Sequence, residues 1–131
     1  MIYLLDTHVL LCSLMDTAKL SDKVREIIEN QENRIAVSVI SLWEISLKFS
    51  LNKLPLEGVS PEDFPKLIED IGFELISLRT EEVSTYHDLN ANWHRDPFDK
   101  MLIWQAIQKN IIFVSSFYGG MHPHFFHINL D

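Results

Sequence analysis

The fold of this chain is decided by residues 2–11, Ile2-Tyr3-Leu4-Leu5-Asp6-Thr7-His8-Val9-Leu10-Leu11. The first four of these residues form an apolar run that ends at Asp6, which predicts a buried β-strand. From Val9 onward, apolar residues recur at the spacing of a helix. A strand that leads directly into a helix is the beginning of a βαβ unit, so this segment predicts an α/β domain.

The rest of the chain alternates between the same two patterns. Apolar runs predict further strands at 35–40, 73–78 and 111–114, and an edge strand at 125–130. Helical spacing predicts helices at 21–28, 42–51, 61–71 and 97–109, and a short helix that opens at Thr80. This alternation predicts a mainly parallel central sheet, in which ligands bind beyond the carboxyl ends of the strands.

Capping residues mark the ends of several predicted helices. Ser21 and Ser41 are expected N-caps, and Asp96 followed by Pro97 opens the most regular helix. Gly72 and Asn110 are the expected ends of two helices, because both residue types tolerate the left-handed conformation that terminates a helix.

Composition and chain length favour one domain that spans residues 1–131, since 47% of the residues are hydrophobic. The apolar runs are far shorter than the roughly 20 residues of a membrane helix, so no membrane span is predicted. The N-terminus has neither a basic leader nor a small-residue cleavage site, which predicts a cytoplasmic protein. Cys12, the single cysteine, is expected to pack as a small apolar residue without a chemical role.

The formal net charge of −8 argues against broad, nonspecific affinity for nucleic acid, because phosphate binding requires unpaired Lys and Arg. It does not exclude a nuclease. Carboxylates that hold cations contribute to the negative charge, and the bound cations then face the phosphate. The same charge would suit a basic protein partner.

Two acids stand beside segments that are predicted to be buried. Asp6 ends the first strand, so its carboxylate lies at the sheet edge, where a charge needs a partner or a metal. Its alternative role is that of N-cap for the following helix. Glu44 lies near the start of a helix, between apolar neighbours, and its alternative role is that of an exposed acid stabilised by the helix dipole.

Asp96 and Asp99 lie three residues apart at the start of the last predicted helix, so they occupy nearby faces of one turn. Asp96 is expected to be the N-cap ahead of Pro97. Asp99 is flanked by apolar residues, which places its charge at the boundary of the core. Asp6, Glu44 and Asp99 come from three separate αβ units, and their convergence at one sheet edge would create an oxygen-rich site for a hard cation.

Three segments, in the same order along the chain, resemble the motifs of PIN-domain ribonucleases. More narrowly, they resemble VapC-type toxins of type II toxin–antitoxin systems, and the third segment is the most specific. The segments are Leu4-Leu5-Asp6-Thr7-His8-Val9-Leu10-Leu11, Ser41-Leu42-Trp43-Glu44-Ile45-Ser46-Leu47-Lys48, and His94-Arg95-Asp96-Pro97-Phe98-Asp99-Lys100-Met101-Leu102-Ile103.

The resemblance, which runs from residue 2 to about residue 116, implies a PIN-like, Rossmann-like fold of three layers. It further implies an endoribonuclease that hydrolyses RNA with Mg²⁺ or Mn²⁺, forms a homodimer and is paired with a cognate VapB-type antitoxin. The implied metal-binding and catalytic residues are Asp6, Glu44 and Asp99. Thr7 and Asp96 are implied as supporting residues.

Phe117 departs from the family pattern, which commonly places a fourth acid after a last strand such as Val114-Ser115-Ser116. An aromatic side chain offers no ligand to a hard cation, so one metal is expected to bind well and a second weakly. This departure leaves an alternative function open. The chain could be a PIN-like fold with impaired catalysis that acts as a binding or regulatory partner.

Other functions fit the sequence less well. The C-terminal histidines, His122, His124 and His127, have no established zinc-ligand spacing. A phosphatase of the aspartate type would need a second acid at position 8, which is His8. A dinucleotide-binding domain would need a glycine-rich turn after the first strand, and that turn contains no glycine.

Basic and aromatic residues near the acidic motifs are the remaining candidates for contact with RNA. His94 and Arg95 precede Asp96 and could contact phosphate, although Arg95 could equally pair with a nearby acid. The three tryptophans are expected in the core or at a dimer surface rather than stacked on bases, because two of them lie on apolar helices. They are Trp43, Trp93 and Trp104.

Overall fold

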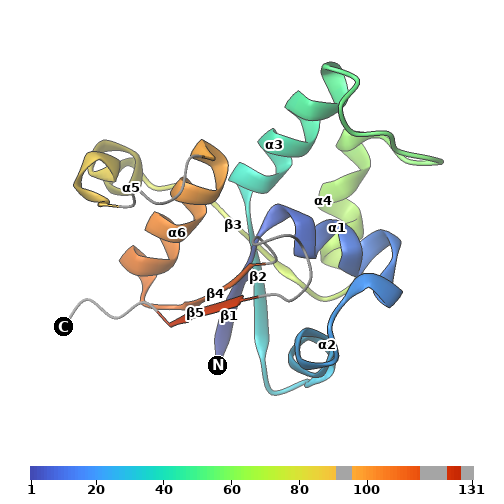
Figure 1. The fold of residues 1–131 in the computed structure, drawn as a ribbon, viewed down its shortest axis with the longest axis horizontal. Helices are drawn as coiled ribbons and strands as arrows, with labels where there is room; N and C mark the ends of the chain where they lie inside the picture. The colour runs from blue at the N-terminus through green and yellow to red at the C-terminus, as the bar shows by residue number, and fades with distance from the viewer. Residues whose placement is uncertain (91–95, 116–123, 128–131) are drawn as a thin grey trace.

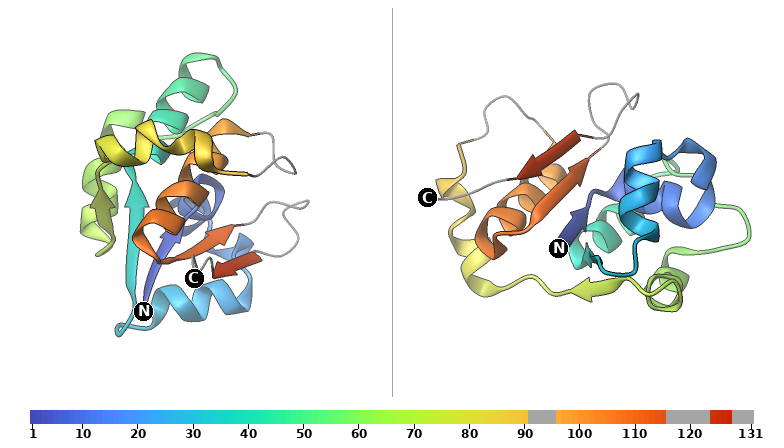
Figure 2. Two further views of the ribbon diagram at one scale, coloured as in Figure 1. Left: turned by 90° about the vertical axis from the view of Figure 1, so that its left-hand side faces the viewer. Right: turned by 90° about the horizontal axis from the view of Figure 1, so that it is seen from below.

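The structure is a computed structural model, and it describes residues 1–90, 96–115 and 124–127, the last of these by backbone alone. Its centre is a five-stranded sheet with the strand order β3-β2-β1-β4-β5. Figure 2 shows this row of strands from β5 and β4 at one edge to β3 at the other. The strands are β1 (Ile2–Leu5), β2 (Arg34–Ser38), β3 (Glu74–Ile76), β4 (Ile112–Ser115) and β5 (His124–His127).

Four of the strands are parallel, and only β5 pairs antiparallel, with β4. The chain proceeds from β1 to β2 and β3 on one side, and later places β4 on the other side of β1. The strand order therefore reverses at β1, and the crevice outside the carboxyl ends of β1 and β4 is where such sheets bind ligands. The predicted α/β class with a mainly parallel sheet is confirmed.

Helices cover both faces of the sheet, which gives three layers (Figure 1). On one face lie α1, α2 and α4, and on the other lie α5 and α6, while α3 stands at the end of the sheet. The helices are α1 (Thr7–Met15), α2 (Asp22–Glu29), α3 (Val39–Ser50), α4 (Phe64–Asp70), α5 (Thr80–Ser84) and α6 (Pro97–Lys109). Short 3₁₀ turns η1 (Thr17–Lys19), η2 (Pro61–Asp63) and η3 (Tyr86–Asp88) connect them.

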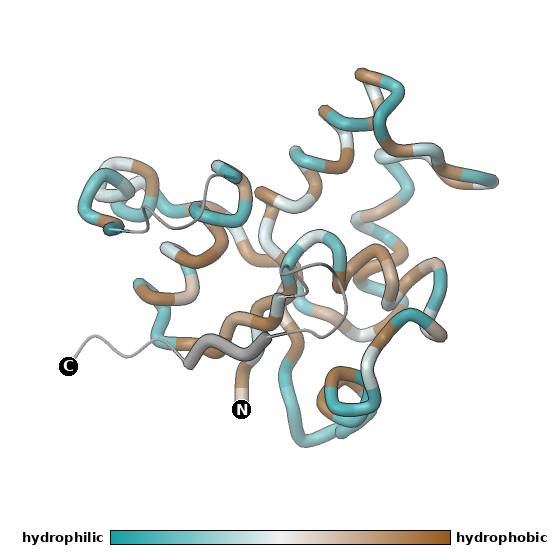
Figure 3. The backbone as a smooth tube through the Cα atoms, in the orientation of Figure 1, coloured by the Kyte–Doolittle hydropathy of each residue, from teal (hydrophilic) through white to brown (hydrophobic). Residues whose placement is uncertain are grey.

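The two faces of the sheet bury alternate residues of each strand. Leu5 and Val37 pack in the cluster with α1, α2 and α4, whereas Leu4 and Ala36 pack in the cluster with α6. This period of two is the geometry of a strand that is covered on both faces. Figure 3 shows largely hydrophobic strands at the centre and a hydrophilic connection between α2 and β2.

Several predicted caps are confirmed. Ser21 accepts a hydrogen bond from the backbone N–H of Val24 at 3.2 Å and thereby caps α2. Asn110, directly after α6, has φ 54°, and Gly72, two residues after the end of α4, has φ 90°. Cys12 is buried, as expected of a packing residue.

The boundary between β2 and α3 was predicted wrongly. The strand predicted at 35–40 ends at Ser38, and the helix begins at Val39 rather than at residue 42. The cap is Ser38, whose Oγ accepts a hydrogen bond from the backbone N–H of Ile40 at 3.1 Å. Ser41, the predicted cap, lies inside the helix instead.

Two other elements are shorter than predicted. The strand expected at 73–78 is reduced to Glu74–Ile76 at the sheet edge, and the helix expected from residue 61 begins with the 3₁₀ turn Pro61–Asp63. The predicted edge strand at 125–130 is present as His124–His127, and its remaining positions lie outside the described residues. In the described part of the chain, none of the helices has the length and apolar character needed to cross a membrane.

Candidate active site

Asp6 follows β1 and lies at the reversal point of the sheet. Its backbone N–H donates to the carbonyl of Val114 at 2.9 Å, which extends the β1–β4 pairing to this residue. Its carboxylate is only 3% exposed, and it accepts hydrogen bonds from the Val9 N–H (2.7 Å) and the Ser115 hydroxyl (2.9 Å). The predicted role as N-cap of α1 is therefore confirmed. A carboxylate has about four acceptor positions, so capping leaves metal ligation chemically possible.

Thr7 connects the starts of two helices. Its hydroxyl donates to the Ser41 hydroxyl at 3.0 Å, and both side chains are buried. This contact holds the first turn of α1 against α3, so it fixes Asp6 relative to the helix that bears Glu44. Ser41 thus positions the site instead of capping the helix.

Glu44 is 5% exposed on α3, so its alternative description as an exposed acid is wrong. Its Oε2 forms an ion pair with the Lys48 ammonium one turn later. Its Oε1 is buried and has no hydrogen-bond partner among the described residues. A buried carboxylate oxygen without a partner is costly, so this oxygen would be stabilised by a cation.

Asp96 and Asp99 lie half-buried in the first turn of α6. Asp96 caps the helix by accepting hydrogen bonds from the N–H groups of Phe98 (2.8 Å) and Asp99 (3.4 Å), as predicted. Partial burial lowers the pKa of Lys48, but its hydrogen bond to Glu44 and the charges of Glu44, Asp96 and Asp99 outweigh that effect and raise it. One ammonium group therefore lies within electrostatic range of acids from both α3 and α6.

The oxygen donors are of the type that a hard cation prefers, but the described carboxylates are not gathered around one point. Within residues 1–90 and 96–115, no group of three or more His, Cys, Asp or Glu side chains is arranged closely enough to hold a metal ion. Lys48 instead provides positive charge between Glu44 and the acids of α6. The unpartnered Glu44 oxygen and the all-oxygen ligands are what Mg²⁺ or Mn²⁺ requires.

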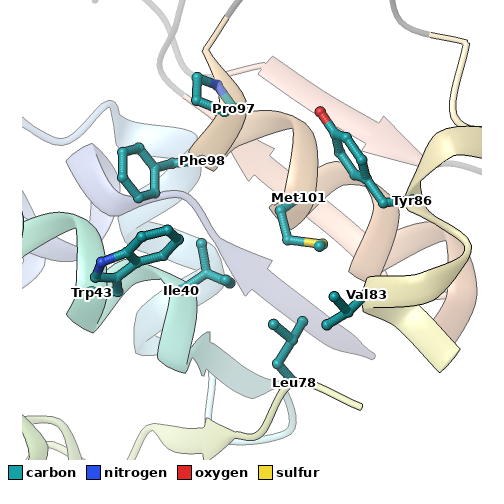
Figure 4. Close-up of a pocket in the computed structure, with 8 residues that line it drawn as sticks. All are labelled: Ile40, Trp43, Leu78, Val83, Tyr86, Pro97, Phe98 and Met101. Atoms are coloured by element: carbon teal, nitrogen blue, oxygen red, sulfur yellow. The ribbon is translucent and has the colours of Figure 1, made fainter. Parts of the chain in front are cut away.

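An apolar pocket of about 270 Å³ opens beside these acids (Figure 4). Trp43 and Phe98 form one wall, with ring centroids 5.0 Å apart in an edge-to-face arrangement. Trp43 is 59% exposed, so of its two expected places, the core and a dimer surface, the core is excluded, whereas Trp104 is buried in the core. The pocket was not predicted from the sequence, because its opposite wall comes from α5 and η3.

Two polar residues of the site were also not predicted. Lys48 follows Glu44 by four residues on one helix face, which is a recognisable ion-pair spacing. Ser115 lies 109 positions from Asp6, and no local pattern indicates that pairing. Several candidates lie outside the described residues: Trp93, His94, Arg95, Phe117 and His122. Of His124 and His127, only the backbone is described.

The fold and this site define a Rossmann-like α/β protein with acidic side chains at the carboxyl ends of its central strands. Residues 3–117 match the PIN domain, and the chain belongs to the PIN domain family. Among solved structures, the chain is similar to VapBC2 from Rickettsia felis, bound to a DNA fragment from their promoter. The TM-score is 0.58, the identity is 19%, and the match covers 86% of each chain, which shows a common fold. No curated protein matches the chain.

Proposed function

We propose that this chain is a metal-dependent endoribonuclease that acts as the toxin of a toxin–antitoxin pair. The observation that favours this function is the buried, unpartnered Oε1 of Glu44, on a helix that faces the acids of α6. A cation at this position would satisfy that oxygen and would reduce the repulsion among the acids. Membership of the PIN family and the likeness of the fold to VapBC2 support the same proposal.

The proposed metal ligands are Asp6, Glu44 and Asp99, with Thr7 and Asp96 in support. Mg²⁺ or Mn²⁺, when bound, supplies an activated water and neutralises charge on the phosphodiester. Asp6 is oriented by its hydrogen bonds to Val9 and Ser115, and Glu44 is held by burial on α3. Lys48 holds a proton and a positive charge at Nζ, which can pair with a phosphate oxygen.

The test is RNA cleavage by the purified protein with Mg²⁺, with Mn²⁺ and with EDTA. Cleavage is expected with either metal and should stop after chelation. Glu44→Gln should abolish it, because an amide lacks the charge that holds a cation, while Glu62→Gln, on the exposed η2 turn, is the control. Cleavage at an undiminished rate in EDTA would contradict the metal-dependent mechanism and would favour acid–base residues.

The proposed partner is a VapB-type antitoxin with a basic or apolar segment that covers the acidic site. The net charge of −8 would attract a basic segment. Leu47 and Leu51 also expose apolar surface one turn apart along α3, as expected of a surface that a partner or a second copy covers. Co-expression with the adjacent reading frame should relieve toxicity, and light scattering should detect the proposed homodimer.

The second candidate function is a PIN-like binding or regulatory protein with impaired catalysis. It is favoured by the absence of a tight three-acid cluster in the described residues and by the aromatic residue at position 117. An RNA cleavage assay across a series of metal concentrations distinguishes the two functions. A catalytically impaired protein would bind its partner but would not cleave RNA at any metal concentration. Under either function we propose a single cytoplasmic domain.

A further inference from the structure

We propose that the apolar pocket beside the acids binds one unpaired nucleobase of the RNA substrate, next to the phosphate that is cut. This inference rests on the proposed nuclease function and adds a base-binding subsite to it. The pocket is formed by three parts of the chain: the start of α3, the start of α6, and the segment through α5 and η3.

The walls of the pocket have the shape and chemistry that suit a flat, neutral ring. Figure 4 shows Trp43 and Phe98 on one side, Val83 and Tyr86 on the other, and Met101 between them. Bases that are splayed out of a stack are held in proteins by such aromatic faces. The volume of about 270 Å³ lies just below the ~300–1,000 Å³ of pockets for drug-sized ligands, so it suits a single ring system.

The pocket adjoins the acidic site at Phe98, which lines the pocket and lies near the Lys48 partner of Glu44. Trp43 directly precedes Glu44 on α3, and Phe98 directly precedes Asp99 on α6. Lys48, the partner of Glu44, has its Nζ 6.0 Å from the centroid of the Phe98 ring. On both α3 and α6, therefore, an aromatic residue that lines the pocket is followed in sequence by an acid of the candidate site.

The acidic site and the apolar pocket suit different parts of a nucleotide, the phosphate and the base. The acids repel an unneutralised phosphate, so the phosphate must lie where a cation or Lys48 meets it. The base has no net charge, and the pocket beside the acids is lined almost entirely by apolar side chains. A ligand that combines a neutral aromatic ring with an adjacent phosphate therefore matches both surfaces.

Packing holds the α5 wall of the pocket in place. Trp104 on α6 donates its indole N–H to the Thr85 hydroxyl at 3.2 Å, and Lys109 lies 3.6 Å from the buried carboxylate of Glu82. Because Val83 lies between Glu82 and Thr85, both ends of its segment are attached to α6. The pocket is thus preformed, which reduces the ordering cost of binding.

The first experiment replaces single bases of a cleaved RNA oligonucleotide by abasic residues and measures kcat/KM. In the wild-type protein, one position next to the cut should lose about 5- to 150-fold, the range for stacking of one base on an aromatic residue. Trp43→Ala and Tyr86→Ala, from opposite walls, should remove the dependence on that same base. Phe49→Ala, an exposed aromatic elsewhere on α3, should retain it.

The second experiment does not depend on cleavage. Adenosine and uridine are titrated into protein with ¹³C-methyl methionine, and the Met101 methyl signal should shift while that of Met15, exposed at the end of α1, should not. Cleavage with no base position that depends on Trp43 would overturn the pocket and leave the nuclease standing. Absence of cleavage would count against the nuclease, and an unmoved Met101 signal would then also overturn the pocket. If Trp43→Ala weakened only the antitoxin complex, the pocket would belong to a protein side chain, which would also overturn it.

Discussion

Asp6 combines a structural role with a proposed catalytic one, and two substitutions separate them. Asp6→Asn keeps an oxygen that can accept from the Val9 N–H, so the free energy of unfolding should stay within about 0.5 kcal/mol of wild type. Asp6→Ala removes the cap and should lose about 1–2 kcal/mol. Both should abolish metal-dependent cleavage, because neither side chain is a carboxylate.

Chemical denaturation and an RNA cleavage assay on the three proteins provide the measurements. If Asp6→Asn cut RNA at the wild-type rate while remaining folded, Asp6 would be a helix cap and nothing more.

Lys48 supplies the positive charge at the acids, so we expect it to compete with a metal for Glu44. Lys48→Met should lower the melting temperature in EDTA, because it leaves the buried Glu44 carboxylate unpaired. The same variant should show a larger rise in melting temperature on addition of Mg²⁺ than wild type, since binding to the native state stabilises it. Thermal denaturation across a Mg²⁺ series measures both effects.

The matched control is Lys66→Met, which removes an exposed ion pair with Asp70 at the same four-residue spacing. We expect this variant to change the melting temperature only slightly, both in EDTA and in Mg²⁺. Equal Mg²⁺ responses in wild type and Lys48→Met would show that the ammonium does not compete with the metal.

At the scale of single residues, the sequence predicted the acids but not their partners. Asp6 and Glu44 could be recognised because each is a charge beside an apolar segment. The Asp6–Ser115 hydrogen bond could not, since it joins residues 109 positions apart and depends on which strands are neighbours. The sequence left Trp43 between the core and a dimer surface, because an apolar helix pattern does not reveal which of its large residues are exposed in the single chain.

Among the helices, α6 depends on Asp96 for its first turn. Asp96→Ala should lower the free energy of unfolding by about 1 kcal/mol, because the Phe98 and Asp99 N–H groups lose their acceptor. Asp96→Asn should be nearly neutral, since Asn is an equally good cap. Denaturant unfolding of both variants tests this expectation.

Cleavage by the Asp96→Asn protein then tests its proposed support of the site. Activity close to wild type would restrict Asp96 to capping, whereas a stable but inactive protein would place its charge in the reaction.

Element boundaries were harder to predict than element types. Val39 and Ile40 extend the β-branched run of β2, so the sequence pattern continues the strand through them. In the structure, the Ser38 cap begins α3 at Val39, and Ile40 packs in the core cluster on the α6 side. A capping hydrogen bond and tertiary packing thus override the local strand propensity.

For the molecule as a whole, charge is the property that limits RNA binding. Ion pairs already engage many of its 11 basic residues, among them Lys19, Arg34, Lys48, Lys66, Arg79 and Lys109. Each of these pairs reduces the contribution of its basic residue to the release of counterions from RNA. At fixed Mg²⁺, the plot of log affinity against log salt should therefore have a slope no steeper than about −2, or about three phosphate contacts at ~0.7 each.

Fluorescence anisotropy of a labelled, uncleavable analogue of single-stranded RNA with the wild-type protein measures this slope. A slope of −5 or steeper would mean that basic residues, and not a neutral pocket and a bound cation, provide most of the affinity.

The overall architecture was the most predictable property, because alternating strand and helix patterns specify a parallel sheet with helices on both faces. The order of the strands was not predicted. The patterns at 2–5 and 111–114 give no indication that these segments pair, since both are simply short and apolar. Strand order depends on long-range packing, and it is this order that brings Ser115 to Asp6.

The place of β1 between β2 and β4 has a consequence for the protein while it is being synthesised. Strand β1 pairs with β4, which begins only at Ile112, so more than 100 further residues must be synthesised before Asp6 gains its contacts with Val114 and Ser115. A nascent chain that ends before β4 lacks one side of the site. We therefore expect a version that stops at residue 110 to be harmless when expressed alone, whereas a growth defect equal to that of the full chain would show that β4 is dispensable. Under the proposed toxin function, the site would be completed only when β4 enters the sheet, late in translation, which would give an antitoxin time to be present.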